Sequence, residues 1–137
     1  MNNERLHNAL IDSLNLSGSG QHQEARRLME DIIAEAIKEG DELTALVVID
    51  HTAMLNSDGR DRSLAKHYYE QFLTSSPDST RMLYESANAA MEDGQIEIAK
   101  QYAKRCHQAV LRSDDKKIKR DLLDLVLERW PEVADRA

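Results

Sequence analysis

Apolar residues recur along most of this chain at intervals of three and four, the spacing that places side chains on one face of an α-helix. In the first such segment the repeating positions include Leu6, Leu10 and Leu14. Six further segments show the same spacing, and breaks rich in glycine, proline, serine or aspartate separate them. The pattern predicts seven helices, over about 3–16, 22–38, 42–56, 61–74, 79–92, 95–111 and 115–129.

The third predicted helix is the most apolar of the seven. Its β-branched run Val47, Val48 and Ile49 is also compatible with a local strand. The apolar pattern is too long for a typical strand and lacks a period of two, so it favours a helix. A helix that is apolar nearly all round predicts a central position, packed on two sides.

Several residues mark where helices start and stop. Gly40 predicts a left-handed C-cap, and Asp41 can then cap the next helix. Ser113 or Asp114 is expected to cap the last helix. That helix ends before Pro131, and we expect the tail that follows to fray.

Three alanines repeat along the chain in the same local setting. Ala25, Ala65 and Ala99 each follow a glycine-containing turn, with intervals of 40 and 34 residues. A small side chain at these positions lets the two helices of a hairpin cross closely. Short connections make successive helices antiparallel, so the chain is expected to form stacked helical hairpins.

The second of these units resembles the tetratricopeptide repeat, which has an alanine, an aromatic residue four positions later and a closing proline. Here Ala65 is followed by Tyr69 and Phe72, and Pro77 closes the unit. The resemblance implies an all-α fold: a short right-handed superhelix in one domain, 1–137. It has three degenerate repeats, about 3–40, 41–77 and 78–112, and a C-terminal capping helix, about 114–130. The alternative is an irregular helical bundle whose alanines reflect ordinary packing.

In proteins of this family, the first helices of the hairpins line a concave groove that binds an extended or helical peptide. The resemblance therefore implies a binding surface for a peptide or partner helix, although the leucines among its positions also suit a core. The implied groove residues are Leu10, Leu14, Val47, Asp50, Met54, Arg81, Tyr84, Asn88 and Met91.

Charge is unevenly distributed along the 137 residues. The net charge is −7, which makes nucleic acid an unlikely partner. Residues 98–121 hold eight bases and three acids, so this stretch is +5 and the remainder is −12. The basic stretch is either a set of solvated helix faces or a docking patch.

No catalytic, cofactor or metal site is expected. The five histidines show no metal-ligand spacing such as His-Glu-x-x-His. Cys106 is the single cysteine, so no intrachain disulfide is possible, and it falls on a packed helix face. The absence of a signal peptide or an apolar span of about 20 residues predicts no membrane association and a cytoplasmic location.

These observations favour a non-catalytic protein–protein interaction module, an adaptor or chaperone that holds an unidentified protein or peptide. Type III secretion chaperones are similar in size, acidity and repeat number, and are one form of such a module. The main alternative is a structural repeat protein that associates with a copy of itself as a homodimer. An enzyme or ligand-binding regulator would rest on the five histidines alone.

Overall fold

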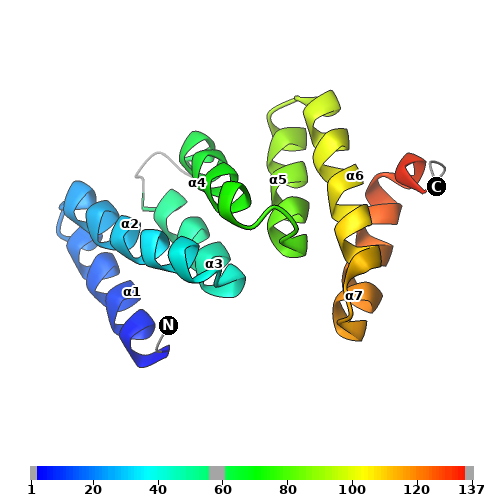
Figure 1. The fold of residues 1–137 in the computed structure, drawn as a ribbon. Helices are drawn as coiled ribbons and strands as arrows, with labels where there is room; N and C mark the ends of the chain where they lie inside the picture. Colours follow the sequence, from blue (N-terminus) through cyan, green and yellow to red (C-terminus); the bar gives the residue numbers. More distant parts are fainter. Residues whose placement is uncertain (1–2, 56–60, 135–137) are drawn as a thin grey trace. The chain divides into compact units, whose positions relative to one another are not determined.

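The computed structural model describes residues 3–55 and 61–134. Within these ranges the chain forms seven α-helices and one 3₁₀ helix, with no strand, so the prediction of an all-α fold is confirmed (Figure 1). The elements are α1 (Asn3–Gly18), α2 (His22–Glu39), α3 (Glu42–Ala53), α4 (Arg62–Ser75), α5 (Thr80–Glu92), α6 (Ile96–Arg112), α7 (Lys116–Arg129) and η1 (Pro131–Val133).

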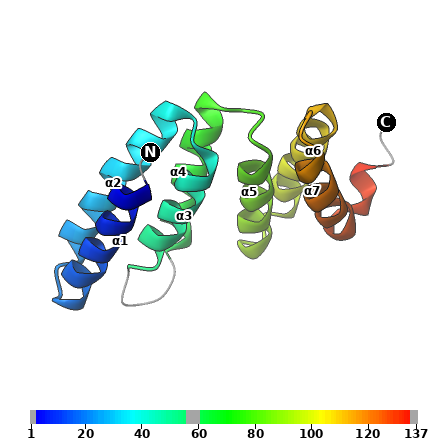
Figure 2. The ribbon, with the colours of Figure 1, turned by 90° about the horizontal axis from the view of Figure 1, so that it is seen from below.

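The helices group into two compact units, Met1–Ser75 and Ser76–Ala137. In the first unit each helix packs on the next, and α2 also contacts α4; α2 runs along α1 in both views (Figures 1 and 2). In the second unit α5 packs on α6, α7 contacts both helices, and η1 contacts α6 and α7. The boundary between the units lies within about two residues of the predicted end of the second repeat, although one domain of three repeats stays a prediction.

Two of the hairpin turns have the same backbone geometry. Gly20 between α1 and α2, and Gly94 between α5 and α6, both adopt positive φ, +82° and +74°. In each turn the amide of the next residue, Gln21 or Gln95, donates to a carbonyl five residues earlier, at 2.8 and 2.9 Å. This is the Schellman motif, which glycine enters at little cost because it has no Cβ. Gly40 caps α2 in the same left-handed conformation, as predicted.

The repeated alanines lie in the interior. Ala25 and Ala99 are fully buried and Ala65 is 1% exposed, which confirms their predicted burial. They pack among large side chains that are themselves shielded from water. In the first unit these include Met29, Ile33, Val48, Ile49, Tyr69 and Phe72, and in the second Met82, Leu83, Val110, Val126 and Trp130.

The most apolar helix, α3, is packed on two sides as predicted, by α2 and α4. Asp41 caps it, accepting a hydrogen bond from the amide of Thr44 at 3.2 Å. A third side of α3 faces water, because Leu43, Val47 and Met54 are all exposed.

Two predictions about the C-terminal region were wrong. The N-cap of α7 is Asp115, which accepts from the amides of Lys117 and Ile118; Ser113 instead accepts a hydrogen bond from the Asp115 amide at 3.1 Å. Fraying of the tail was predicted, but residues Pro131–Val133 form the 3₁₀ helix η1, because Trp130 just before it and Val133 at its end are buried. Residues 135–137, and the predicted turn at 56–59, lie outside the described ranges.

Candidate protein-binding surface

A hydrogen bond between Ser13 and His51 links α1 directly to α3. The Ser13 hydroxyl lies 2.6 Å from Nε2 of His51 and donates its proton to the Leu10 carbonyl at 2.8 Å. Since that proton is committed, the Nε2–H of His51 donates to Ser13 Oγ. Because α2 reverses the chain between them, α1 and α3 run in the same direction.

Large apolar side chains stand exposed around this bond. Leu14 follows Ser13 directly, Val47 lies one turn before His51, and Met54 lies nearly one turn after it. Nine large apolar side chains are exposed in the described residues, and five of them belong to α1, to α3 or to the C-cap of α3. We call this set the α1–α3 face: Ile11, Leu14, Leu43, Val47 and Met54.

The α1–α3 face has an acidic edge. Asp50 is exposed, three residues after Val47 on the same helix, and its carboxylate accepts a hydrogen bond from the Tyr69 hydroxyl at 3.3 Å. Sequence positions 1–75 hold 13 acids and seven bases, so this unit carries −6 of the total −7. The predicted groove residue Leu10 is half-buried and serves partly as packing.

The remaining predicted groove residues belong to α5 in the second unit. Arg81, Tyr84, Asn88 and Met91 are all half-buried. Two of them contact the end of α7: the Tyr84 and Trp130 rings meet edge to face at 6.3 Å, and the Arg129 guanidinium donates to the Asn88 side-chain oxygen. The structure thus brings the predicted residues together in two sets, one in each unit.

The Ser13–His51 pair has the residue types of a nucleophile and its base, yet its setting is structural. Ser13 is fully buried, and its hydroxyl proton points at a backbone carbonyl, so an incoming substrate has no access to it. Burial lowers the pKa of His51 below its ordinary value, which favours the neutral imidazole. The pair therefore acts as a polar link between α1 and α3.

A second polar cluster joins α2 to α4. Burial first, and then the adjacent Glu30 carboxylate, raise the pKa of the Tyr68 hydroxyl to about 12. Arg26 pairs with Asp61 at 3.4 Å, and Asp61 also caps α4 by accepting from the Leu64 amide at 3.0 Å. These contacts link α2 to the start of α4.

Other chemistry finds little support in the described residues. No group of three or more histidine, cysteine or acidic side chains there could hold a metal ion. Cys106 is buried, as predicted, and its thiol donates to the Thr80 carbonyl at 3.3 Å. Among the described residues, no helix combines the length and apolar character needed to cross a bilayer.

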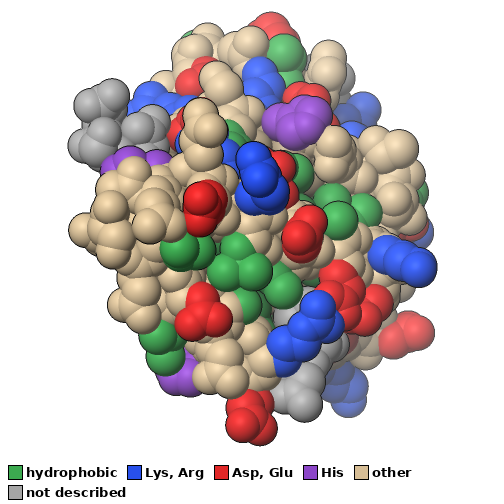
Figure 3. Space-filling view, turned by 90° about the vertical axis from the view of Figure 1, so that its left-hand side faces the viewer, with side chains coloured by type: hydrophobic (Ala, Val, Ile, Leu, Met, Phe, Trp, Pro, Cys, Tyr) green, Lys and Arg blue, Asp and Glu red, His purple; other side chains and the backbone are tan. Residues whose placement is uncertain are grey.

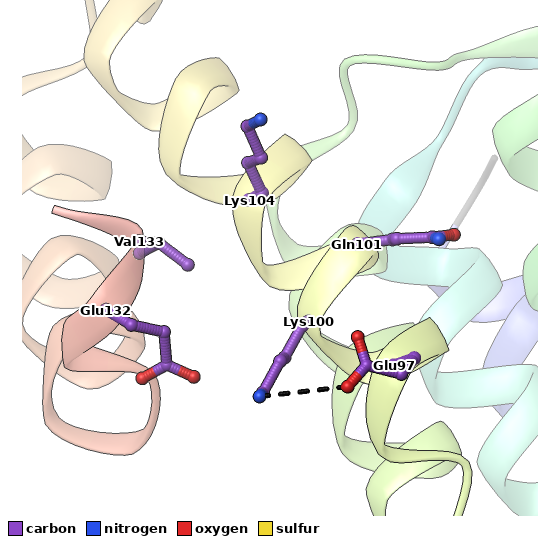
Figure 4. Close-up of a pocket in the computed structure, with 6 residues that line it drawn as sticks. All are labelled: Glu97, Lys100, Gln101, Lys104, Glu132 and Val133. Carbon is purple, nitrogen blue, oxygen red and sulfur yellow. Dashed lines mark ion pairs between the residues drawn. The ribbon is translucent and has the colours of Figure 1, made fainter. Parts of the chain in front are cut away.

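A hollow of about 410 Å³ lies between α6 and η1 (Figure 4). Lys100 pairs with Glu97 at 3.9 Å on its α6 wall, and Glu132 of η1 stands across from Lys100. Because charges of both signs line this open hollow, no single class of ligand is favoured there.

Reasoning from sequence missed His51 and two members of the α1–α3 face, Ile11 and Leu43. The partner of His51 lies 38 residues earlier, so no local pattern could reveal the bond. Leu43 could have been found, because it lies four residues before Val47 on the same helix face.

No family model matches this chain, and no curated protein matches it either. Its fold is similar to that of a solved structure, the Yersinia enterocolitica type III secretion translocator chaperone SycD in a form described as an alternative dimer. The TM-score is 0.54 at 14% identity, and the match covers 99% of this chain and 98% of the other. At that identity the likeness concerns the fold alone, which is all-helical over the described residues.

Proposed function

We propose that this protein is a non-catalytic interaction module, an adaptor or chaperone, that binds a peptide or helix of another protein on the α1–α3 face. The observation that carries the proposal is the exposure of five large apolar side chains along two adjacent helices of one unit. Such side chains gain about 25 cal/mol per Å² when they leave water, and contiguous exposed apolar patches mark interaction sites.

The chemistry of the face indicates what it binds. Leu14, Val47 and Met54 offer apolar contact, and the flexible thioether of Met54 adapts to ligands of different shape. Asp50 and the net charge of −6 on its unit favour a ligand with basic residues beside its apolar ones. The fitting partner is an amphipathic helix or extended segment with apolar anchors and a basic edge.

The second unit contributes predicted contacts as well. Arg81, Tyr84, Asn88 and Met91 of α5 each keep part of the side chain in water. We assign them a smaller contribution, because Tyr84 and Asn88 already contact the end of α7.

The proposal is tested by a pair of matched variants. Val47 is 50% exposed on the α1–α3 face, and Leu111 is 52% exposed on α6 of the other unit. A partner captured from the native cell is purified and titrated against the full-length protein. We expect Val47→Glu to weaken binding at least about tenfold, about 1.4 kcal/mol, because it buries a carboxylate in an apolar contact.

Leu111→Glu removes as much exposed apolar surface and adds the same charge elsewhere, so it should bind like the wild type. Equal weakening by both variants would show that an added surface charge lowers the affinity wherever it is placed, and would give no support to the α1–α3 face. Unchanged binding in Val47→Glu would refute the assignment of the face.

A further inference from the structure

A hollow of about 500 Å³ on the outer side of α1 and α2 lies away from the binding face proposed above. Three acids, Glu4, Asp12 and Asp31, line it together with one base, Arg5, which pairs with Glu35 at 2.8 Å. Within residues 3–55 and 61–134 neither aspartate forms an ion pair with a lysine or arginine. Figure 3 views this end of the first unit, where acidic and basic side chains both border an apolar area. The apolar lining of the hollow comes from Ala9, Leu28 and Ile32.

This hollow is electrostatically suited to a cation. Its lining carries three acids against one arginine, and the unit to which it belongs carries −6. An inserted lysine offsets this excess of negative charge, while its alkyl stem packs against Leu28 and Ile32. The fitting ligand therefore presents several basic side chains on a helix or turn.

The start of α7 has the complementary character. Lys116, Lys117, Lys119 and Arg120 are all exposed there, and the first turn contains no acidic residue. Cations at a helix N-terminus oppose the helix dipole. The capping carboxylate of Asp115 offsets part of this cost. A local arrangement that opposes helix stability is typical of a functional surface.

We propose that the basic start of α7 of one copy docks into the acidic α1–α2 hollow of a second copy, head to tail. Both surfaces belong to the same sequence, and their charges and apolar content are complementary. The two surfaces differ, so the contact is heterologous and leaves a free hollow and a free basic turn at opposite ends of a pair. The association is weak, salt-dependent and independent of the α1–α3 face.

The test is a charge exchange followed by sedimentation equilibrium of the full chain. Variant one carries Asp12→Lys and Asp31→Lys; variant two carries Lys117→Glu and Lys119→Glu. At an ionic strength of about 10 mM, where the Debye length is about 30 Å, the wild type should show an average mass that rises with concentration. At about 1 M, with a Debye length of about 3 Å, it should be monomeric.

Each variant alone should remain monomeric at low salt, because both of its ends carry the same sign. An equimolar mixture should associate, since the native basic turn of variant one meets the native hollow of variant two. Glutamate in the first turn of α7 favours the helix dipole, so variant two retains its fold. Asp12→Asn with Asp31→Asn replaces variant one if circular dichroism shows that the lysine pair unfolds the chain.

Three outcomes would overturn the proposal: a wild type that is monomeric at low salt, association that persists in either variant alone, or a mixture that stays monomeric. Association that persists in variant one would place the contact on another face. A monomeric wild type that binds an acidic peptide through Lys117 would identify a foreign partner in place of a second copy.

Discussion

The small side chain of Ala25 allows α1 and α2 to pack closely in the first hairpin. It is fully buried, as is Ala99, and Ala65 is buried nearly as completely, each in a helix that packs against the preceding one or the next. A methyl group at such a position allows dense packing, and a larger side chain must displace its neighbours.

We expect Ala25→Leu to lower the free energy of unfolding by about 1–3 kcal/mol, because the added atoms overpack the interior. Ala34 lies on the same helix and is exposed, so Ala34→Leu is the matched control, with a change within about 0.5 kcal/mol. Urea unfolding followed by circular dichroism measures both. Similar values for the two variants would show that Ala25 is not a tight contact.

Among the elements, the turns decide how the helices pair. The motifs at Gly20 and Gly94 place a positive-φ glycine at the same distance before a buried alanine, so two hairpins start their second helix in the same way. Gly18 precedes the first of these turns and is the last residue of α1. Gly18 therefore has a helical backbone, whereas Gly20 requires a positive φ.

Gly20→Ala should destabilise the protein by about 1–2 kcal/mol, since alanine is strained at a φ of +82°. Gly18→Ala should be neutral or stabilise it by up to about 1 kcal/mol, because alanine favours the helix and a Cβ there meets no atom within 4 Å. Thermal unfolding of the two variants tests this difference in sign. Equal destabilisation would contradict the assigned turn.

The burial of His51 in its link to Ser13 predicts that the free energy of unfolding depends on pH. Burial lowers the pKa of folded His51 below the ordinary value of 6.5, so the unfolded chain takes up a proton first as the pH falls. The free energy of unfolding should therefore decrease as the pH drops through about 6.5. His51→Gln keeps a donor for Ser13 and cannot titrate, and it should flatten this part of the profile measured by urea unfolding. An unchanged profile would exclude His51 as the cause.

The sequence was informative where the cause is local. Gly40, Asp41 and the spacing around Ala65 predicted real caps and a buried core, because capping and helix periodicity act within a few residues. It failed where tertiary contacts decide. Burial of Trp130 orders the chain past Pro131, and no short-range pattern near Pro131 indicates that burial.

For the candidate site, the resemblance to the tetratricopeptide repeat implied Leu14, Val47 and Met54 as groove residues, and all three are exposed on α1, α3 and its C-cap; that they bind a partner stays a prediction. The sequence could not show that these side chains stay uncovered in the folded chain, since burial depends on segments that are far apart in sequence. Nor could it show that Tyr84 contacts Trp130, 46 positions later in the chain.

At the scale of the molecule, negative charge is concentrated in the first unit, which carries −6 of the net −7. The exposed large apolar side chains of the described residues are divided five to four between the units, and the five in the first unit all belong to α1, α3 and its C-cap. The proposed function rests on these five side chains, and its central claim is that the α1–α3 face holds a partner protein.

Site-directed photo-crosslinking in the native cell tests this claim most directly. A photoreactive amino acid replaces Val47 in one version of the full chain and Leu111, equally exposed on α6, in the other. The account predicts a covalent adduct with another protein from position 47, and none with that protein from position 111. Equal yields of that adduct from both positions, or adducts from position 47 that contain only copies of this chain, would contradict it.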